Sequence, residues 1–197
     1  MSDATTRKYD PIAVSNESTV VAEYVSDATV EAAYQSEADL ERELIRLLQS
    51  QAYEYLPITS EAQLVTNLRT QLESLNGITF SGAEWTQFFA ERIAGANDGI
   101  VEKTVRIQED HVQLLKRDDG STKNILLIDK QNIHNNRLQV INQYAIDQGD
   151  GGSARSNRYD VTVLVNGLPM VHIELKRRGV DIREAFNQID RYQRDSF

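Results

Sequence analysis

The chain has 197 residues, of which 40% are hydrophobic and 26% charged, a composition typical of one globular domain with a hydrophobic core. It has no cysteine, which excludes disulfides and thiolate-bound zinc, so any metal would be held by oxygen or imidazole ligands. Its net charge of −9 argues against a domain that holds DNA unaided, because duplex binding depends on neutralising phosphates with Lys and Arg.

Charge is distributed unevenly along the chain. Residues 151–197 contain eight Lys and Arg against six Asp and Glu, whereas residues 1–150 carry a net charge of −11. Any contact with nucleic acid is therefore expected in the last quarter, and the acidic remainder is also explained by solubility alone. Since neither a secretory signal nor an apolar run of membrane-spanning length is found, we expect a cytoplasmic protein with no membrane contact.

The first part of the chain predicts an arm followed by a helix. Residues 1–35 are polar with short apolar patches, and we expect an irregular N-terminal arm there, with one domain over residues 36–197. Ser36, followed three residues later by Asp39, is typical of a helix N-terminus, and apolar residues continue one helical face until Pro57 ends it.

Two further helices are expected before residue 99. One covers residues 60–75 and stops at Asn76-Gly77, where glycine can adopt the left-handed conformation that ends helices. The other follows Ser81 and runs through aromatic residues to about Gly95. The N-terminal part of the domain is therefore predicted to be helical.

The second half of the chain has the pattern of a sheet. Residues 111–115 and 124–128 flank a turn and predict a hairpin, and residues 138–141 predict another strand. Residues 159–176 place two β-rich runs on either side of Asn166-Gly167, a pair favoured in hairpin turns. A last helix is expected over residues 182–195, so the fold class is α/β or α+β, with a mixed sheet flanked by helices.

Strand periodicity places the charged residues of the second hairpin on particular faces. Asp160 points away from the face of Val161, and Glu174 shares a face with Lys176 on the return strand. A strict two-residue turn would set Asp160 opposite Ile173, whereas a three-residue loop sets it opposite Glu174. The apolar pattern favours the second register, because it pairs Val161 with Ile173.

In this register Asp160, Glu174 and Lys176 have the groups that a metal-dependent hydrolase needs. Two carboxylates and the backbone carbonyl of Leu175 supply part of an octahedral oxygen cage for Mg²⁺, which polarises a phosphodiester and activates water. Lys176 would orient that water or balance charge. The alternative is a solvated strand face on which Asp160 simply pairs with Lys176.

The strongest indication is a resemblance to a known family. Residues 157–179 (NRYDVTVLVNGLPMVHIELKRRG) resemble the PD-(D/E)xK nuclease motif as it occurs in the restriction (R) subunits of type I restriction-modification enzymes. Residues 184–192 (EAFNQIDRY) resemble the Q-x-x-x-Y element of the RecB-like branch. Residues 34–45 and 75–78 are similar to the same subunits, most closely their IC subfamily. The one departure is Tyr159, which stands where the superfamily motif has proline.

The resemblance implies a restriction-endonuclease-like core that hydrolyses DNA phosphodiester bonds with Mg²⁺, for which Mn²⁺ substitutes. Asp160 and Glu174 would be metal ligands together with the Leu175 carbonyl, and Lys176 the catalytic base or stabiliser. An acid from the first helix often completes such sites, and Glu37 is favoured over Glu41.

The last helix would contribute Gln188 and Tyr192. They are four residues apart and so share one face, where they would contact the DNA backbone or brace the site. The alternative is a polar pair at the edge of the core.

The resemblance also implies partners. These are double-stranded DNA and the methyltransferase (M) and specificity (S) subunits, with ATP used only by the full-length subunit. No G-x-x-x-x-G-K-[ST] phosphate loop occurs here, so we expect a fragment that is weak or inactive alone. Two alternatives stay open: a non-catalytic module that docks the subunit onto the methyltransferase core, and a RecB-like nuclease of another defence or repair system.

Overall fold

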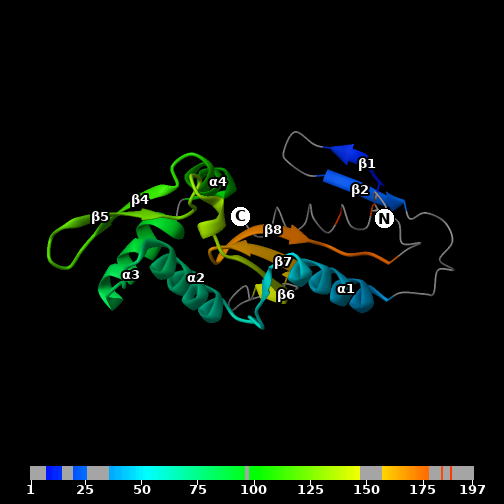
Figure 1. Cartoon of the computed structure of the whole chain (residues 1–197), viewed down its shortest axis with the longest axis horizontal. Coiled ribbons are helices and arrows are strands. Elements are labelled where there is room, and N and C mark those ends of the chain that lie inside the picture. The colour runs from blue at the N-terminus through cyan, green and yellow to red at the C-terminus, as the bar shows by residue number, and fades with distance from the viewer. Residues whose placement is uncertain are drawn as a thin grey trace, which may run out of the picture. The chain divides into compact units, whose positions relative to one another are not determined.

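The computed structural model of the chain describes residues 8–14, 20–25, 36–95, 98–146 and 157–177, together with Arg183 and Asn187. Residues 1–35 and residues 36–197 form two compact units. The first unit contains two antiparallel strands, β1 (Lys8–Val14) and β2 (Val20–Val25) (Figure 1). The expectation of an irregular arm is therefore wrong for these residues, whose valines and tyrosines have high strand propensity.

Serine caps begin the first two helices of the second unit. At α1 (Glu37–Ser50) the hydroxyl of Ser36 accepts a hydrogen bond from the backbone N–H of Asp39, and the Asp39 carboxylate accepts one from the N–H of Ser36. α2 (Glu61–Asn76) ends at Gly77, which has φ 58°. Both helices begin where the sequence predicts, but α1 ends at Ser50, before the predicted end at Pro57.

The helical part continues with one predicted element and one that was not predicted. α3 (Gly82–Phe88) passes directly into a π-helical turn, η1 (Phe89–Ile93). α4 (Ile100–Gln108) follows, in a segment for which no helix was predicted. Its first turn is stabilised by Glu102, whose carboxylate accepts a hydrogen bond from the N–H of Gly99 at 3.0 Å. No helix in the described part of the chain is long and apolar enough to cross a membrane.

The central sheet has four strands in the order β3-β6-β7-β8, with β3 parallel to β6 and the others antiparallel. Its strands are β3 (Glu54–Tyr55), β6 (Leu138–Ile146), β7 (Asn157–Val165) and β8 (Leu168–Ile173). A separate hairpin of β4 (Val112–Lys116) and β5 (Thr122–Leu126) and a short 3-10 helix η2 (Ile133–Asn135) precede β6. The mixed α and β content confirms the predicted class.

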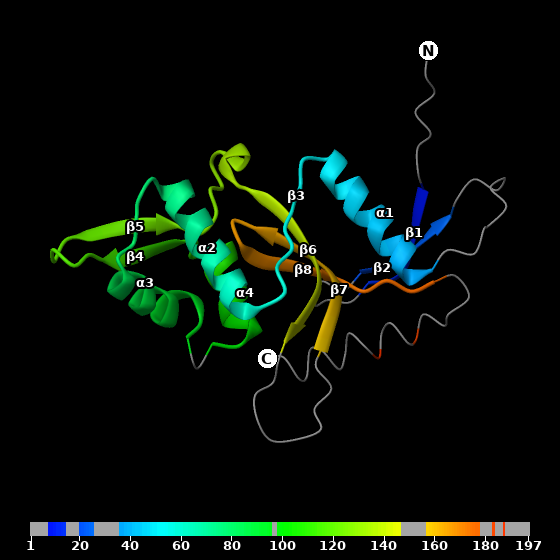
Figure 2. The ribbon, with the colours of Figure 1, turned by 90° about the horizontal axis from the view of Figure 1, so that it is seen from below.

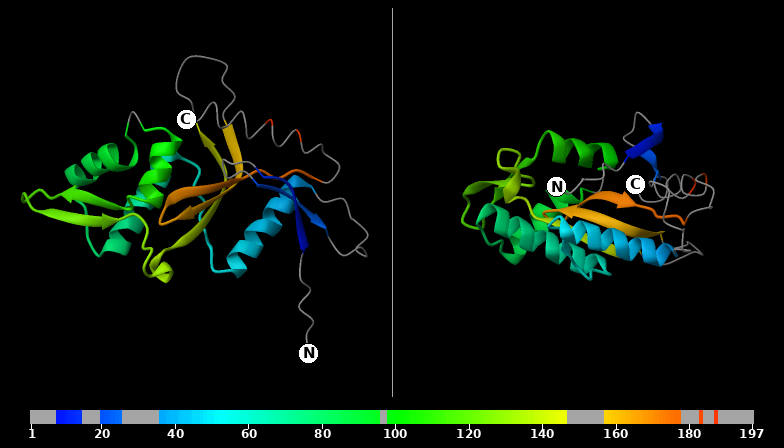
Figure 3. Two further views of the ribbon diagram at one scale, coloured as in Figure 1. Left: turned by 90° about the horizontal axis from the view of Figure 1, so that it is seen from above. Right: turned by 45° about the vertical axis from the view of Figure 1, so that its right-hand side comes forward.

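Two apolar cores stabilise this unit, and α2 contributes to both. Figure 2 shows α2 between the β4–β5 hairpin and the central sheet. Leu68 and Leu72 of α2 belong to the core beneath the β4–β5 hairpin, and Leu64 packs against the core beside the sheet. In Figure 3, the blue to cyan helix α1 lies along one side of the yellow and orange strands.

The β7–β8 hairpin has the predicted register for a different reason. Its turn has two residues, Asn166 and Gly167, with φ 51° and 81°. The register then shifts within β8, where Met170 is the additional residue of a bulge, and Val161 pairs with Ile173. The predicted three-residue loop is therefore wrong, but the predicted Val161–Ile173 pair is confirmed.

This turn is buried. Asn166 is 1% exposed, and its side chain donates to the Leu127 carbonyl at 3.0 Å and accepts from the Arg137 N–H at 2.8 Å. Gly167 lies so close to α2 that a Cβ atom would be 2.6 Å from the Cα atom of Leu68. The hairpin is therefore fixed to the helical part at its turn.

Candidate functional site

At the end of the hairpin opposite the turn, the structure brings together Asp160, Glu174 and Lys176. The Lys176 ammonium donates to Glu174 Oε1 at 2.6 Å, and the N–H of Leu175 donates to Asp160 Oδ2 at 2.9 Å. Continuing the register of the hairpin by one residue places Asp160 opposite Glu174, where directly opposed Cβ atoms are about 4.5 to 5.5 Å apart. Two carboxylates and one ammonium therefore share a small volume at this edge.

Glu174 is the most buried member of this cluster, with a side chain that is 5% exposed. Burial raises the pKa of its carboxyl group above the ordinary value, and the neighbouring charge of Asp160 raises it further, while Lys176 opposes both effects. Its Oε2 atom is buried without a hydrogen-bond partner among the described residues. Such an oxygen is costly to bury unless something else binds it.

Lys176 has a raised pKa although its side chain is only 20% exposed. Burial acts to lower the pKa of the ammonium, but the hydrogen bond and charge of Glu174, with the charges of Glu37 and Asp160, raise it above the ordinary value. The lysine is therefore an ammonium that balances the carboxylates in the metal-free site.

The two candidate acids of α1 have different surroundings. Glu37 Oε1 accepts from the N–H of Arg177 at 3.4 Å, and its charge reaches Lys176. Glu41, one turn later, is 9% exposed and accepts from the amide of Asn142 at 2.5 Å and from the amide of Gln143. Both acids face the end of the hairpin, but both oxygens of Glu41 already have donors.

The donor set fits a hard divalent cation in its chemistry. No group of three His, Cys, Asp or Glu side chains with metal-binding geometry occurs in the part of the chain that the structure describes. Two carboxylates, with water and substrate completing the shell, are nevertheless a common way of binding Mg²⁺. The buried Oε2 of Glu174 is an available donor.

Comparison with known proteins identifies the family. Residues 34–197 match the family described as the N terminus of the type I restriction enzyme R protein. The chain belongs to this family.

Similarity to individual relatives supports the same family assignment. The chain is 48% identical over 188 residues to the type I restriction enzyme EcoprrI endonuclease subunit of Escherichia coli, covering 95% of this chain and 58% of the relative. It is 39% identical over 165 residues to the SsaAORF53P endonuclease subunit of Staphylococcus saprophyticus, covering 83% of this chain and 17% of the relative. This R protein N terminus therefore spans between about a sixth and about three fifths of the length of these relatives.

Some residues predicted for this R protein N terminus cannot be placed. Gln188 and Tyr192 lie outside the described residues. Arg183 and Asn187, within the predicted last helix, are helical. The role of the Leu175 carbonyl stays a prediction, since the contact that the structure gives for Leu175 is that of its N–H.

Polar residues of β6 were missed by sequence reasoning. Asn142 and Gln143 lie within β6, and both donate to Glu41. The signal in the sequence was an Asn-Gln pair directly after the apolar run 138–141. His172, in contrast, contacts Thr162 Oγ1 through Nδ1 at 2.9 Å and stacks on Tyr159.

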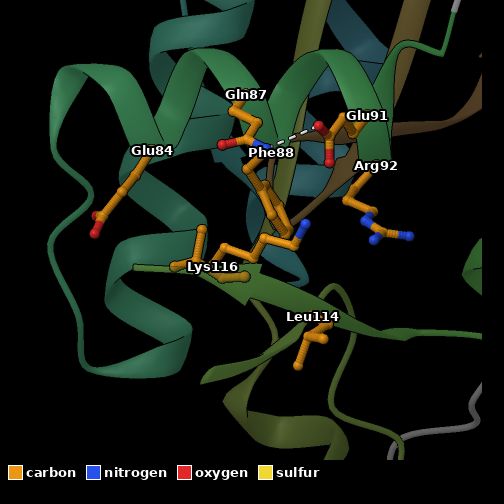
Figure 4. Close-up of a pocket in the computed structure, with 8 residues that line it drawn as sticks. Glu84, Gln87, Phe88, Glu91, Arg92, Leu114 and Lys116 are labelled. Carbon is orange, nitrogen blue, oxygen red and sulfur yellow. Dashed lines mark hydrogen bonds between the residues drawn. The ribbon is translucent and has the colours of Figure 1, made fainter. Parts of the chain in front are cut away.

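Two cavities in the described part of this R protein N terminus lie away from this cluster. One of about 10 Å³ is shown in Figure 4, where Gln87 and Glu91 of the α3–η1 segment lie on one side and Leu114 and Lys116 of β4 on the other. A second, of about 330 Å³, is lined by residues of the segment 79–84 and of the β4–β5 turn. Neither is lined by Asp160, Glu174 or Lys176.

Proposed function

We propose that this chain forms the Mg²⁺-dependent endonuclease part of a type I restriction enzyme R protein. Asp160 and Glu174, with the Leu175 carbonyl, bind the Mg²⁺ ion. The ammonium group of Lys176 lies beside it and takes part in catalysis. The observation that carries the proposal is the buried, unpartnered Oε2 of Glu174 next to a second carboxylate. A site built only for stability would provide a donor for that oxygen.

Each of the chain's own residues has a distinct task in this reaction. The N–H of Leu175 holds one oxygen of Asp160, which fixes how the carboxylate is presented to the cation. Lys176 neutralises the cluster before the cation arrives, and afterwards its ammonium is available to orient the attacking water and balance the charge on the phosphate. A bound Mg²⁺ ion would supply Lewis-acid polarisation of the phosphodiester.

The rest of the proposed activity belongs to the longer protein. We infer that an R protein containing this segment translocates double-stranded DNA with ATP and works with methyltransferase (M) and specificity (S) subunits. The net charge of −9 supports this division, since DNA would then be held mainly by other parts of the assembly.

A second candidate function has one observation in its favour. Ile100, Val101 and Val105 of α4 are 46%, 66% and 43% exposed, as expected if this helix docks on another protein surface. The segment would then be a non-catalytic module that joins the R protein to the methyltransferase core.

Titration calorimetry with Mn²⁺ and Mg²⁺ on the 197-residue chain tests the nuclease proposal. Asp160→Asn and Glu174→Gln should abolish cation binding and, in the longer R protein with its partner subunits, reduce DNA cleavage by at least about a thousandfold, as removal of a metal ligand or electrostatic group does. Glu43→Gln, which removes an exposed carboxylate of α1, is the matched control and should leave both unchanged. Full cleavage by the Asp160 and Glu174 variants would instead favour the docking module.

A further inference from the structure

We propose that the side-chain amide oxygen of Gln143 is a third ligand of the cation, and that Glu41 acts on the site only through Gln143. The proposal rests on the nuclease function argued above, and it assigns roles to β6 and to the first helix. Glu41 is then a positioning residue, and Gln143 a residue that touches the cation.

Strand register places Gln143 beside the carboxylates. Asn142 pairs with Val161 and Tyr144 with Tyr159, so Gln143 falls opposite Asp160. Asp160 in turn falls opposite Glu174 on the other side of β7. The backbone positions of the three residues therefore form one row across neighbouring strands, which are about 4.8 Å apart.

The partners of Gln143 fix which end of its amide faces the site. Its Nε2 donates to Glu41 Oε2, so its Oε1 must point to other surroundings. In the described part of the chain two side-chain oxygens are buried without a hydrogen-bond partner, Gln143 Oε1 and Glu174 Oε2. Both residues have backbone positions in this row, and a single ion between the two oxygens would satisfy both.

Each oxygen of Glu41 already accepts a hydrogen bond from a side-chain amide of β6. Its Oε1 accepts from Asn142 at 2.5 Å and its Oε2 from Gln143. A carboxylate that accepts a hydrogen bond from the NH₂ group of an amide orients the amide oxygen, as carboxylates that hydrogen-bond to metal-bound histidines orient the imidazole. The acid of the first helix therefore contributes by orienting a ligand.

The backbone of Gln143 supports a functional constraint. Its φ of 55° is the left-handed conformation, which a non-glycine residue rarely adopts within a strand. This conformation lets two consecutive side chains, Asn142 and Gln143, reach one carboxylate, although consecutive residues of a regular strand point to opposite faces. Such local strain persists where the surrounding contacts impose it, and it is concentrated at functional sites.

The chemistry of the row suits a divalent ion. An amide oxygen is a hard, neutral donor, so Gln143 adds a ligand without adding charge. Two carboxylates then balance a divalent ion, and the Lys176 ammonium is released from Glu174 for contact with substrate.

The test measures Mn²⁺ binding by the 197-residue chain. Electron paramagnetic resonance detects the Mn²⁺ that remains free. Gln143→Met removes the oxygen at nearly constant volume and should weaken binding at least about tenfold. Gln139→Met is the matched control: Gln139 is a buried glutamine of the same strand whose amide bonds to Asn67 and Glu54, and the substitution should leave the affinity unchanged.

A double-mutant cycle separates positioning from structural support. Glu41→Gln should weaken Mn²⁺ binding by itself, yet have no further effect in a chain that already carries Gln143→Met. If Gln143→Met fails to fold by circular dichroism, Gln143→Asn replaces it, since it keeps the amide but withdraws the oxygen by one methylene group.

Three outcomes would be decisive. Loss of binding in Asp160→Asn with wild-type affinity in the Gln143 variant would overturn this inference and leave the nuclease proposal standing. Additive effects of the Glu41 and Gln143 substitutions would overturn the positioning role. A wild-type chain that binds no Mn²⁺ would overturn both proposals.

Discussion

Two buried glutamates of this domain have opposite surroundings. Glu84, at the start of α3, has a side chain that is 3% exposed, and Glu174, at the end of β8, one that is 5% exposed. Both oxygens of Glu84 are bonded, to the N–H groups of Ser81 and Asp118 at 2.9 and 3.0 Å and to the Arg117 guanidinium at 3.1 Å. Glu174 has one bonded oxygen and one without a partner among the residues that the structure describes.

The pKa values of the two groups shift in opposite directions. The backbone N–H of Ser81, followed by that of Asp118, holds the pKa of Glu84 below its ordinary value, whereas burial raises the pKa of Glu174. Two equally buried carboxyl groups can therefore have pKa values shifted in opposite directions, depending on whether hydrogen-bond donors surround them. Glu84 stabilises the junction of α3 with the β4–β5 hairpin, while the buried oxygen of Glu174 is the one that the proposed cation would bind.

The position of Glu174 depends on the buried turn of its hairpin, so the largest effect is expected at Gly167. Gly167→Ala should lower the free energy of unfolding by about 3 kcal/mol, because the new Cβ would meet the α2 backbone at a φ of 81°. Gly120→Ala is the control, because Gly120 has φ 82° but a Cβ atom there would have no neighbouring atom within 4 Å. This substitution should lower the free energy of unfolding by about 1 kcal/mol. Urea denaturation measures both, and equal losses would show that the close approach to α2 is unimportant.

At the structural glutamate, Glu84→Gln should lower the melting temperature at pH 7 by about 5 °C. The substitution removes the charge that pairs with Arg117 and replaces one acceptor oxygen by a donor that faces backbone N–H groups. Differential scanning calorimetry measures the change. Glu43→Gln, at an exposed pair, should shift the melting temperature by less than about 2 °C, and a similar shift in both variants would contradict the structural role of Glu84.

The same pair of variants predicts a pH dependence. Because the pKa of Glu84 in the folded state lies below its ordinary value of 4.5, its stabilising effect is fully present above that value and is lost as the pH falls through the folded-state pKa. The difference in melting temperature between the wild-type chain and Glu84→Gln should therefore be constant from pH 7 to about pH 5 and shrink below the ordinary pKa. A constant difference down to pH 3 would show that the hydrogen bonds do not depend on the charge.

The smallest effect on stability is expected at Glu174. Without a cation, Glu174→Gln should change the free energy of unfolding at pH 7 by less than about 1 kcal/mol, because it removes a buried charge that the fold does not fully satisfy. With Mg²⁺ at a hundred times its dissociation constant, the free energy of unfolding of the wild-type chain should rise by about 2.7 kcal/mol, and that of Glu174→Gln should not. Thermal melts with and without Mg²⁺ check this, and a large loss in the metal-free variant would make Glu174 structural like Glu84.

Local chemistry explains why much of the fold could be predicted. Ser36 and Gly77 mark helix ends by hydrogen-bonding and conformational rules that act within a few residues. The Val161–Ile173 pair followed from the need to bury apolar side chains together. These predictions needed no knowledge of distant contacts.

Other features depend on contacts that sequence patterns do not report. α4 was missed because Ile100, Val101 and Val105 are β-branched residues of low helix propensity, and Ile107 alone of its apolar residues packs against the core in the described part of the chain. The bulge at Met170 and the left-handed Gln143 are backbone irregularities that only the assembled sheet imposes. For the site, motif resemblance could name the carboxylates, but the link from Glu41 to Gln143 spans 102 residues of sequence.

The close contact of Gly167 with the backbone of Leu68 has a mechanical consequence. β7 is a stiff connector, and the five residues from Val165 back to Asp160 span about 17 Å. A small tilt of α2, which is anchored in both apolar cores, would swing the far end of this connector relative to α1. Force on one helix would thereby alter the spacing of the acidic groups without touching any of them.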